Sequence, residues 1–245
     1  MNALLKTTEM EARLLAREPL ALFFSIVFPT LLLIVMGLVP ALTEPSEQFG
    51  GARFIDYFAP SIIVLTLAMI ALQVVPNTLA AYREQGVMRR LSVTPASPAH
   101  VLIAHLATNL GVALLSTVLV VAVGRIAFDV PLPRHMLGFV VAFVVGMTAL
   151  FALGLIIAAV ATTTRAASGL ATLAFMVVMF FGGVYLPRFL LPDTIVRIGA
   201  YTPPGVQALL DGWIGTAPPS GFHLLIMGLI AVAAAAAAAK LFRWE

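Results

Sequence analysis

The chain has 245 residues, of which 61% are apolar and 10% are charged, and its mean hydropathy is +1.06. Roughly a quarter of the residues of a soluble domain are charged, so this composition excludes a soluble protein and indicates an integral membrane protein. The net charge of +3 comes without a basic stripe interleaved with aromatics, which argues against a nucleic-acid partner. The absence of cysteine excludes disulfides, thiol nucleophiles and iron–sulfur ligation.

The first expected element is an amphipathic helix over residues 1–18. Charged residues at spacings of three and four form one stripe, made of Lys6, Glu9, Arg13 and Arg17. Smaller or apolar residues lie largely opposite, namely Leu4, Thr8, Ala12 and Leu15. Such a helix can lie in the headgroup plane, and Pro19 then marks a bend into the membrane. An ordinary solvated face is the alternative interpretation.

Six stretches without charges follow, each able to hold the roughly 20 apolar residues that cross a bilayer as a helix. The expected spans are residues 20–42, 58–81, 101–124, 137–161, 166–186 and 222–240. Their apolar runs are continuous rather than alternating, which favours helices over a barrel. The sequence therefore predicts an all-α integral membrane protein with six transmembrane helices in a single domain, residues 1–245.

The basic residues outside the spans predict the orientation. Six spans place both chain ends on one side, together with nine of the 14 basic residues: Lys6, Arg13, Arg17, Arg83, Arg89, Arg90, Arg165, Lys240 and Arg243. Because the positive side faces the cytoplasm, we expect cytoplasmic termini in a multi-pass protein of a bacterial cytoplasmic membrane.

Two segments between the spans stand out. In residues 83–97, Gly86 and Pro95 bracket a short helix whose charges offer contacts to a partner; a merely solvated turn is the alternative. In residues 187–220, repeated prolines forbid one continuous helix, yet the apolar residues between them do not suit a free loop. Re-entrant or interfacial helices reconcile these facts, with a simple capped loop as the alternative.

The remaining polar residues give no catalytic pattern. The histidines are scattered, without metal-ligand spacing, and Ser168 and His223 are expected about 30 Å apart on opposite membrane faces, which excludes a serine protease. His105, about one turn inside the third span, is expected to reach the interface by snorkelling. Apart from Lys240, the last residue of the sixth, the expected spans contain no charged residue, and the chain has no phosphate-binding loop for ATP. Energy for transport would therefore come from another subunit.

Two spans carry residues that bear on packing and transport. The small-residue stripe Gly154, Ala158 and Thr162 suits close helix contacts, more often within one subunit than between subunits. On the fifth span, methionines and aromatics could line an adaptable apolar path, because such side chains accommodate varied shapes. These candidates are Phe175, Met176, Met179 and Phe180, with lipid-facing or core packing as an equal alternative.

The chain resembles the permease subunits of type-2 ABC exporters, the ABC-2 family that includes daunorubicin-type drug exporters and polysaccharide exporters. The segment from Arg83 to Ser97 is similar to the family's cytoplasmic coupling segment, and the Gly- and Pro-rich segment after the fifth span to its outer segment. The resemblance implies ATPase coupling by Arg83, Glu84, Gly86, Arg89, Arg90, Leu91, Thr94 and Pro95. It implies an outer re-entrant motif made of Gly182, Gly183, Pro187, Pro192, Pro203 and Pro204.

The resemblance also implies a permease that performs no chemistry and holds no cofactor, with ATP and Mg on separate ABC ATPase subunits. Two permeases, identical or paralogous, would form a dimer in the lipid bilayer. An uncharged path suits efflux of a lipophilic drug, as in antibiotic resistance, or of a lipid or lipid-linked substrate. The alternative is a membrane scaffold or secondary transporter without an ATPase partner.

Overall fold

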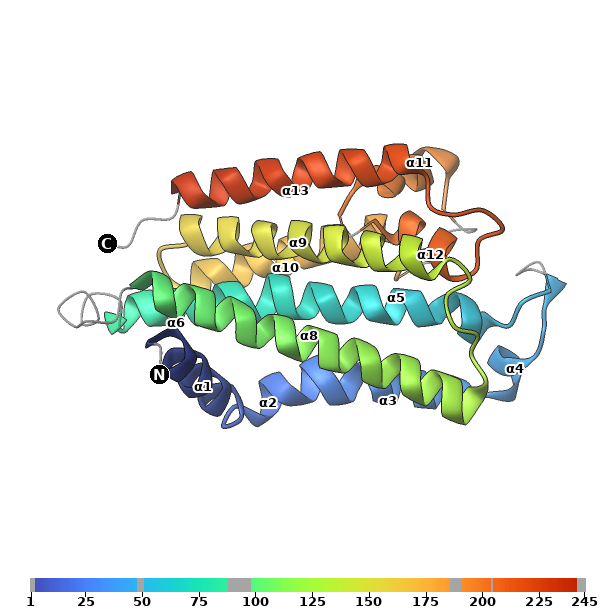
Figure 1. Ribbon diagram of the computed structural model, residues 1–245, viewed down its shortest axis with the longest axis horizontal. Helices are drawn as coiled ribbons and strands as arrows, with labels where there is room; N and C mark the ends of the chain where they lie inside the picture. The colour runs from blue at the N-terminus through green and yellow to red at the C-terminus, as the bar shows by residue number, and fades with distance from the viewer. Residues whose placement is uncertain (1–2, 48–50, 88–97, 186–190, 204, 242–245) are drawn as a thin grey trace.

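A computed structural model describes residues 3–47, 51–87, 98–185, 191–203 and 205–241. Long helices run side by side along the longest axis (Figure 1). Helix α1 (Ala3–Leu15) and the last turn of α13 (Gly221–Leu241) lie at the same end of this bundle, which we call the N/C end. The opposite end, which we call the far end, holds α4 (Pro40–Thr43).

Six helical runs are long and apolar enough to cross a membrane, which confirms the predicted all-α membrane fold. They are Pro19–Gly37, Phe54–Glu84, Ala99–Phe128, Met136–Val160, Thr164–Phe181 and Gly221–Leu241. The first consists of α2 (Pro19–Leu22), η1 (Phe23–Val27) and α3 (Phe28–Gly37), and the second of α5 (Phe54–Ala68), η3 (Met69–Val74) and α6 (Val75–Glu84). The others are α8 (Pro98–Phe128), α9 (Met136–Val160), α10 (Thr164–Phe181) and α13.

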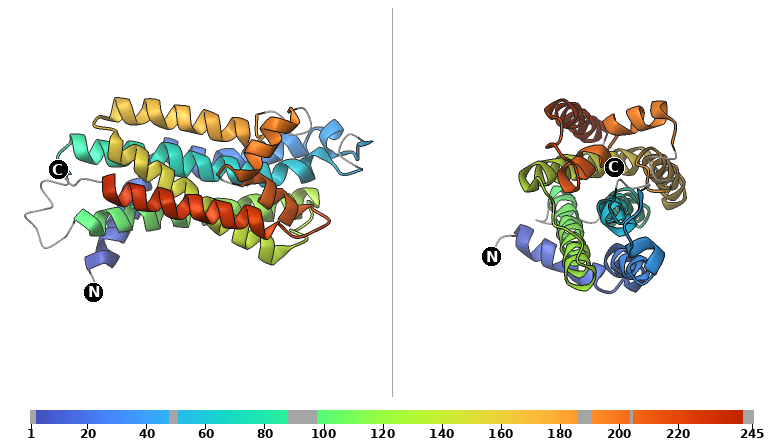
Figure 2. Two further views of the ribbon diagram at one scale, coloured as in Figure 1. Left: turned by 90° about the horizontal axis from the view of Figure 1, so that it is seen from above. Right: turned by 90° about the vertical axis from the view of Figure 1, so that its right-hand side faces the viewer.

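The second run forms the centre of the bundle. It contacts α3, α8, α9, α10 and the short helix α12 (Val206–Trp213), and in the end-on view of Figure 2 it lies between the other helices. Most of its apolar side chains are buried, for example Ile62, Leu67 and Leu72 with no exposed surface. A helix buried on every side needs no polar face, which explains its continuous apolar sequence.

Both of the first two runs contain a π-helical turn, η1 and η3. In each case a proline follows two residues after the turn ends, Pro29 after Val27 and Pro76 after Val74. Proline lacks an N–H and its ring crowds the carbonyl four residues earlier. The widened π-helical turn makes room for the proline ring, which would clash with this carbonyl in a regular α-helix. Beside η3, the Ala71 carbonyl lies so close to Gly154 of α9 that a Cβ there would stand 1.9 Å from its oxygen.

The close approach at Gly154 bears on the small-residue stripe of α9. Gly154 and Ala158 are buried against neighbouring helices of the same chain, which confirms the predicted packing within one subunit for these two residues. Thr162 is exposed, because α9 ends at Val160 and the chain has already turned away. The stripe therefore serves the contact of α9 with the central run.

At the far end, Arg53 joins two connections of the chain. Its guanidinium donates to both carboxylate oxygens of Asp56, at 2.9 and 2.7 Å, and to the carbonyls of Phe128 and Asp129, both at 2.9 Å. The bonds to Asp56 raise the pKa of Arg53 above its ordinary value. The helix begins earlier than the expected residue 58 and includes the buried Asp56, whose charge Arg53 compensates.

Replacing Arg53 with leucine is expected to destabilise the protein by about 2–4 kcal/mol, because the buried Asp56 carboxylate and two carbonyls lose their donors. Thermal unfolding in detergent measures the loss. Arg125→Leu is the matched control, since Arg125 is exposed and lies 3.8 Å from Asp129 in a weak surface pair. Equal stability of the two variants would contradict a structural role for Arg53.

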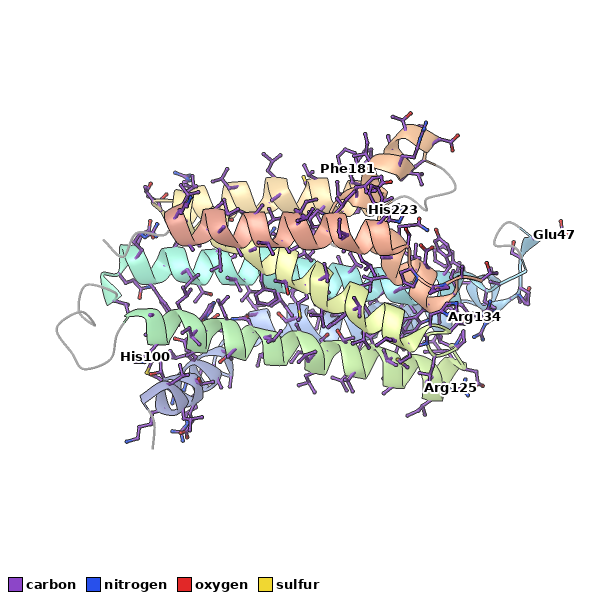
Figure 3. The ribbon with its side chains drawn as sticks, turned by 45° about the horizontal axis from the view of Figure 1, so that its top comes forward. Glu47, His100, Arg125, Arg134, Phe181 and His223 are labelled. Carbon is purple, nitrogen blue, oxygen red and sulfur yellow. The ribbon has the colours of Figure 1, made fainter. Side chains whose placement is uncertain are left out.

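The segment between the fifth and sixth spans forms two short helices, α11 (Asp193–Tyr201) and α12, so the simple capped loop is wrong. Gly182 caps α10, which ends at Phe181 (Figure 3), and Gly183 follows with a φ of +69°. Pro192 immediately precedes α11 and Pro203 lies between the two helices, whereas Pro187 and Pro204 fall outside the described residues. Helix α12 returns into the bundle and buries Leu209 and Trp213 against α5 and α9.

Candidate functional site

The described part of the predicted coupling segment begins at the last turn of α6. The Arg83 guanidinium donates to the carbonyls of Ala158 and Ala161, at 3.1 and 2.8 Å. These carbonyls belong to the end of α9, where backbone oxygens lack partners within the helix and the helix dipole is negative. A cation is favoured at this position, and Arg83 therefore caps α9.

The next residue, Glu84, binds the start of α10. Its carboxylate accepts hydrogen bonds from the backbone N–H of Thr164, at 3.0 Å, and from the Thr164 hydroxyl, at 2.6 Å. The side chain of Thr163 completes this helix start by accepting from the N–H of Ala166 at 3.1 Å. An anion and a threonine cap are both favourable at a helix N-terminus.

Arg83 and Glu84 thus hold the two sides of the turn that connects α9 and α10, and we call this arrangement the turn clamp. Directly after the clamp, Gly86 adopts a φ of +66° and its N–H donates to the carbonyl of Arg83 at 3.0 Å, which ends α6. The remaining predicted coupling residues, Arg89, Arg90, Leu91, Thr94 and Pro95, lie outside the described residues. The clamp therefore connects the start of the predicted coupling segment to two other spans.

A buried polar cluster lies at the same end of the bundle, where α1 contacts α8. The Glu11 carboxylate accepts from the Tyr82 hydroxyl at 3.0 and 3.1 Å and lies 3.0 Å from Nδ1 of His105. The side-chain amide of Asn109 lies 3.2 Å from Nε2 of His105 and donates to the His105 carbonyl at 2.9 Å. Glu11, His105 and Asn109 are only 3%, 4% and 2% exposed. We call these four residues the Glu11 cluster.

The Glu11 cluster corrects the expectation that His105 snorkels to the interface, since its ring is buried and partnered. Lys6, Glu9 and Arg13 of the predicted charged stripe lie exposed on α1, whereas Arg17 follows the end of the helix at Leu15. Leu4, Thr8 and Leu15 are partly buried, and Ala12 is exposed. Sequence reasoning missed Glu11, although a signal was present. Glu11 lies seven residues after Leu4 and four before Leu15, which places a carboxylate on the inward face of the helix.

A lateral groove of about 410 Å³ opens between the first two helical runs and α10. Both π-helical turns contribute to its wall, and its lining is apolar apart from one hydroxyl and one amide side chain. The lining residues are Leu20, Ala21, Phe24, Ser25, Met69, Gln73, Val74 and Phe175. π-Helical turns are found frequently at functional sites.

Comparison with protein families identifies the chain. The sequence profile described as ABC-2 type transporter matches residues 5–208, which reach from α1 into α12. The chain belongs to the ABC-2 type transporter family. Comparison with curated proteins gave no match. ABC-2 membrane domains are permease components, so this membership favours an ABC-type permease over a scaffold or an unrelated secondary transporter.

In this ABC-2 permease, the four candidates for a substrate path do not come together. Phe175 lines the lateral groove, whereas Met179 is completely buried in the core. Met176 and Phe180 are 55% and 38% exposed on the outer surface of α10. Within the described residues, no group of three or more His, Asp or Glu side chains is placed to hold a metal ion. The candidate site of the permease is therefore the turn clamp together with the groove.

Proposed function

We propose that this chain is the membrane subunit of an ATP-driven exporter that moves a lipophilic drug, a lipid or a lipid-linked molecule out of the cytoplasm or inner leaflet. Separate ABC ATPase subunits hold ATP and Mg, and they bind residues 83–97 at the N/C end. A second permease, identical or paralogous, completes the transporter. The N/C end then faces the cytoplasm of a bacterial cell, as the distribution of basic residues favours.

The turn clamp is the observation that carries this proposal. A partner that moves residues 85–97 pulls on the end of α6, and through Arg83 and Glu84 it pulls on α9 and α10 as well. Charge-assisted hydrogen bonds to helix ends are short and directional, so the three helices respond together. A movement at one loop is thereby distributed to three of the six spans.

The lateral groove supports the proposal that the substrate is lipophilic. Its wall offers the Ser25 hydroxyl and the Gln73 amide among apolar side chains, and its lining contains no charged residue. Phe175 of α10 belongs to this lining, so a movement of α10 through the clamp changes the width of the groove. An apolar groove that opens sideways favours a molecule that approaches from the lipid over one that approaches from water.

The decisive experiment reverses two charges of the coupling segment. The full-length chain with Arg89→Glu and Arg90→Glu is purified in mild detergent from its native host, and bound partners and ATP hydrolysis are measured. We expect the wild-type chain to recover an ATPase and the variant to lose it, because reversed charges repel the surface that bound them. Arg125→Glu at the far end (Figure 3) is the matched control and should retain the partner.

Two results would contradict the proposal. If the folded wild-type chain recovers no ATPase under gentle conditions, the ATP-driven mechanism is wrong. If an ATPase is present but the transporter exports only a hydrophilic glycan, the proposed class of substrate is wrong and the coupling role stands.

A further inference from the structure

A second groove lies between α8 and α9, on the face of the bundle that Figure 1 shows. Both helices pack against the second helical run, but they have no extensive contact with each other. They leave a space of about 550 Å³, and α13 contributes a third wall with Ala235, Ala238 and Ala239. The lateral groove opens elsewhere, between the first two helical runs and α10. We call the second space the α8–α9 groove.

The floor of the α8–α9 groove belongs to a small core around α6. Val75 and Leu79 of α6 are buried in this core, and Leu106 and Phe151 of the groove lining pack against it. Packed side chains that lose neighbours on one side lose the corresponding dispersion contacts. A molecule that fills the groove therefore supports α6, the helix whose last turn carries the turn clamp.

The walls of the groove are suited to hydrocarbon. Thr148 is the one polar residue among the described residues that line it, and its hydroxyl donates to the carbonyl of Val144 at 2.8 Å. The described lining therefore leaves no side-chain donor free. A polar molecule that entered the groove would lose hydrogen bonds without replacing them, which costs free energy, whereas a hydrocarbon chain has none to lose.

The dimensions of the groove match one leaflet of a bilayer. Its α8 wall runs from Leu102 to Leu110 and its α9 wall from Met147 to Leu155, each about 12 Å long at a rise of 1.5 Å per residue. One leaflet of a bilayer core is about 15 Å thick. A space of 550 Å³ over this length has a mean cross-section of about 45 Å², whereas a helix about 10–12 Å wide occupies about 80–110 Å². The groove thus admits a hydrocarbon chain but not a helix of a second copy.

A basic residue stands where the groove reaches the membrane surface. The lining residues of α8 belong to its first half and those of α13 to its last two turns, so the groove occupies the half of the bundle toward the N/C end. Lys240 directly follows Ala239, is exposed, and forms no ion pair within the described part of the chain. Its flexible stem allows the ammonium group to reach the headgroups, where a phosphate is the complementary charge.

We propose that the α8–α9 groove holds an acyl chain of an anionic phospholipid from the leaflet at the N/C end, with the phosphate bound by Lys240. This lipid is a resident component of the protein rather than a transported molecule, because its groove is separate from the lateral groove. Its binding requires no ATPase, so this proposal stands or falls independently of the coupling mechanism. By supporting α6 from the side, the lipid stabilises the helix that carries the turn clamp.

Native mass spectrometry of the full-length chain tests the lipid and its headgroup. The chain is purified in mild detergent without an ATPase and is incubated with phosphatidylglycerol, or with phosphatidylcholine that has the same acyl chains. We expect one phosphatidylglycerol to remain bound per chain, about fivefold more tightly than phosphatidylcholine, which is the contribution of one basic residue beside an anionic lipid. Lys240→Gln should remove this preference. Lys6→Gln, which makes the same change of charge on the exposed side of α1, should keep it.

Two adjacent alanines of α13 provide a matched pair of substitutions that test the position of the lipid. Ala235 and Ala236 are both exposed, but of the two only Ala235 lines the groove. Ala235→Phe should lower lipid retention by about tenfold, because the larger side chain fills the space of the acyl chain, whereas Ala236→Phe should bind as the wild type does. Thr148→Phe fills the groove from α9 and should repeat the loss, so the test remains if one variant fails to fold.

Several results would overturn the proposal. Failure of the wild type to retain phosphatidylglycerol would exclude the site, and equal retention of the two lipids would refute the role of Lys240. Lipid that survives Ala235→Phe and Thr148→Phe but is lost in Ala21→Phe would belong to the lateral groove. A groove substitution that changes the oligomeric state and leaves the lipid bound would show that a second copy of the chain covers this face.

Discussion

A Gly154→Ala substitution is expected to prevent stable folding of the permease. The added Cβ would stand 1.9 Å from the Ala71 carbonyl oxygen and 3.1 Å from its carbon, so α9 and the central run must separate. Both elements belong to the buried centre of the bundle, where overpacking costs about 1–3 kcal/mol and a backbone clash costs more. Thermal unfolding and the yield of monodisperse protein in detergent measure the effect.

Gly111→Ala in α8 is the matched control for this substitution. A Cβ at Gly111 meets nothing within 4 Å, and both substitutions replace a helical glycine with a better helix former. The control should therefore be neutral or slightly stabilising. If Gly154→Ala unfolds at the same temperature as the control, the close contact of α9 with the π-helical turn is not as the structure describes it.

A Glu84→Ala substitution is expected to separate ATP hydrolysis from transport. It removes both acceptors at the start of α10, so α10 loses its hydrogen bonds to the end of α6 and follows the coupling segment less closely when that segment moves. Export should fall by about tenfold or more, the loss from about 1.4 kcal/mol of coupling, while the ATPase still binds and hydrolyses ATP. Copurification, ATP hydrolysis and export by the same preparation measure the three properties.

The comparison with the Arg89→Glu, Arg90→Glu variant makes this test specific. That variant should lose the partner, whereas Glu84→Ala should keep the partner and lose the transmission of movement. Glu9→Ala, on the exposed side of α1, controls for the loss of one negative charge at the N/C end. Normal export by Glu84→Ala would refute the turn clamp as the route of coupling.

The all-α fold could be predicted from the sequence because apolar runs of this length have few other solutions in a membrane. The ends of the spans were harder, since they depend on tertiary partners. The second helical run was expected to stop at residue 81 but continues to Glu84, because Arg83 and Glu84 find partners on a neighbouring turn. It also begins earlier, where Arg53 compensates the charge of Asp56.

The sequence predicts candidate functional residues where their side chains are charged, but it does not predict their partners. The charges of Arg83 and Glu84 mark them in the sequence, but Arg83 binds backbone carbonyls more than 70 residues away, and backbone atoms leave no signature in a sequence. The pairing of Glu11 with His105 joins residues 94 positions apart. On α10, an almost wholly apolar sequence does not show that Met179 enters the core while Met176 faces outward.

The π-helical turn η3 determines the direction in which the residues after it point. In a π-helical turn the hydrogen bond spans five residues instead of the four of an α-helix, so the turn holds one additional residue. Each residue of an α-helix advances about 100° around the helix axis. Everything beyond Val74 is therefore rotated by about this angle relative to a regular helix. Tyr82, Arg83 and Glu84 lie beyond this turn, and they make their contacts with Glu11 and with the turn between α9 and α10 from the rotated positions. One additional residue near the middle of the second helical run thus determines which way the side chains at the N/C end of that run point.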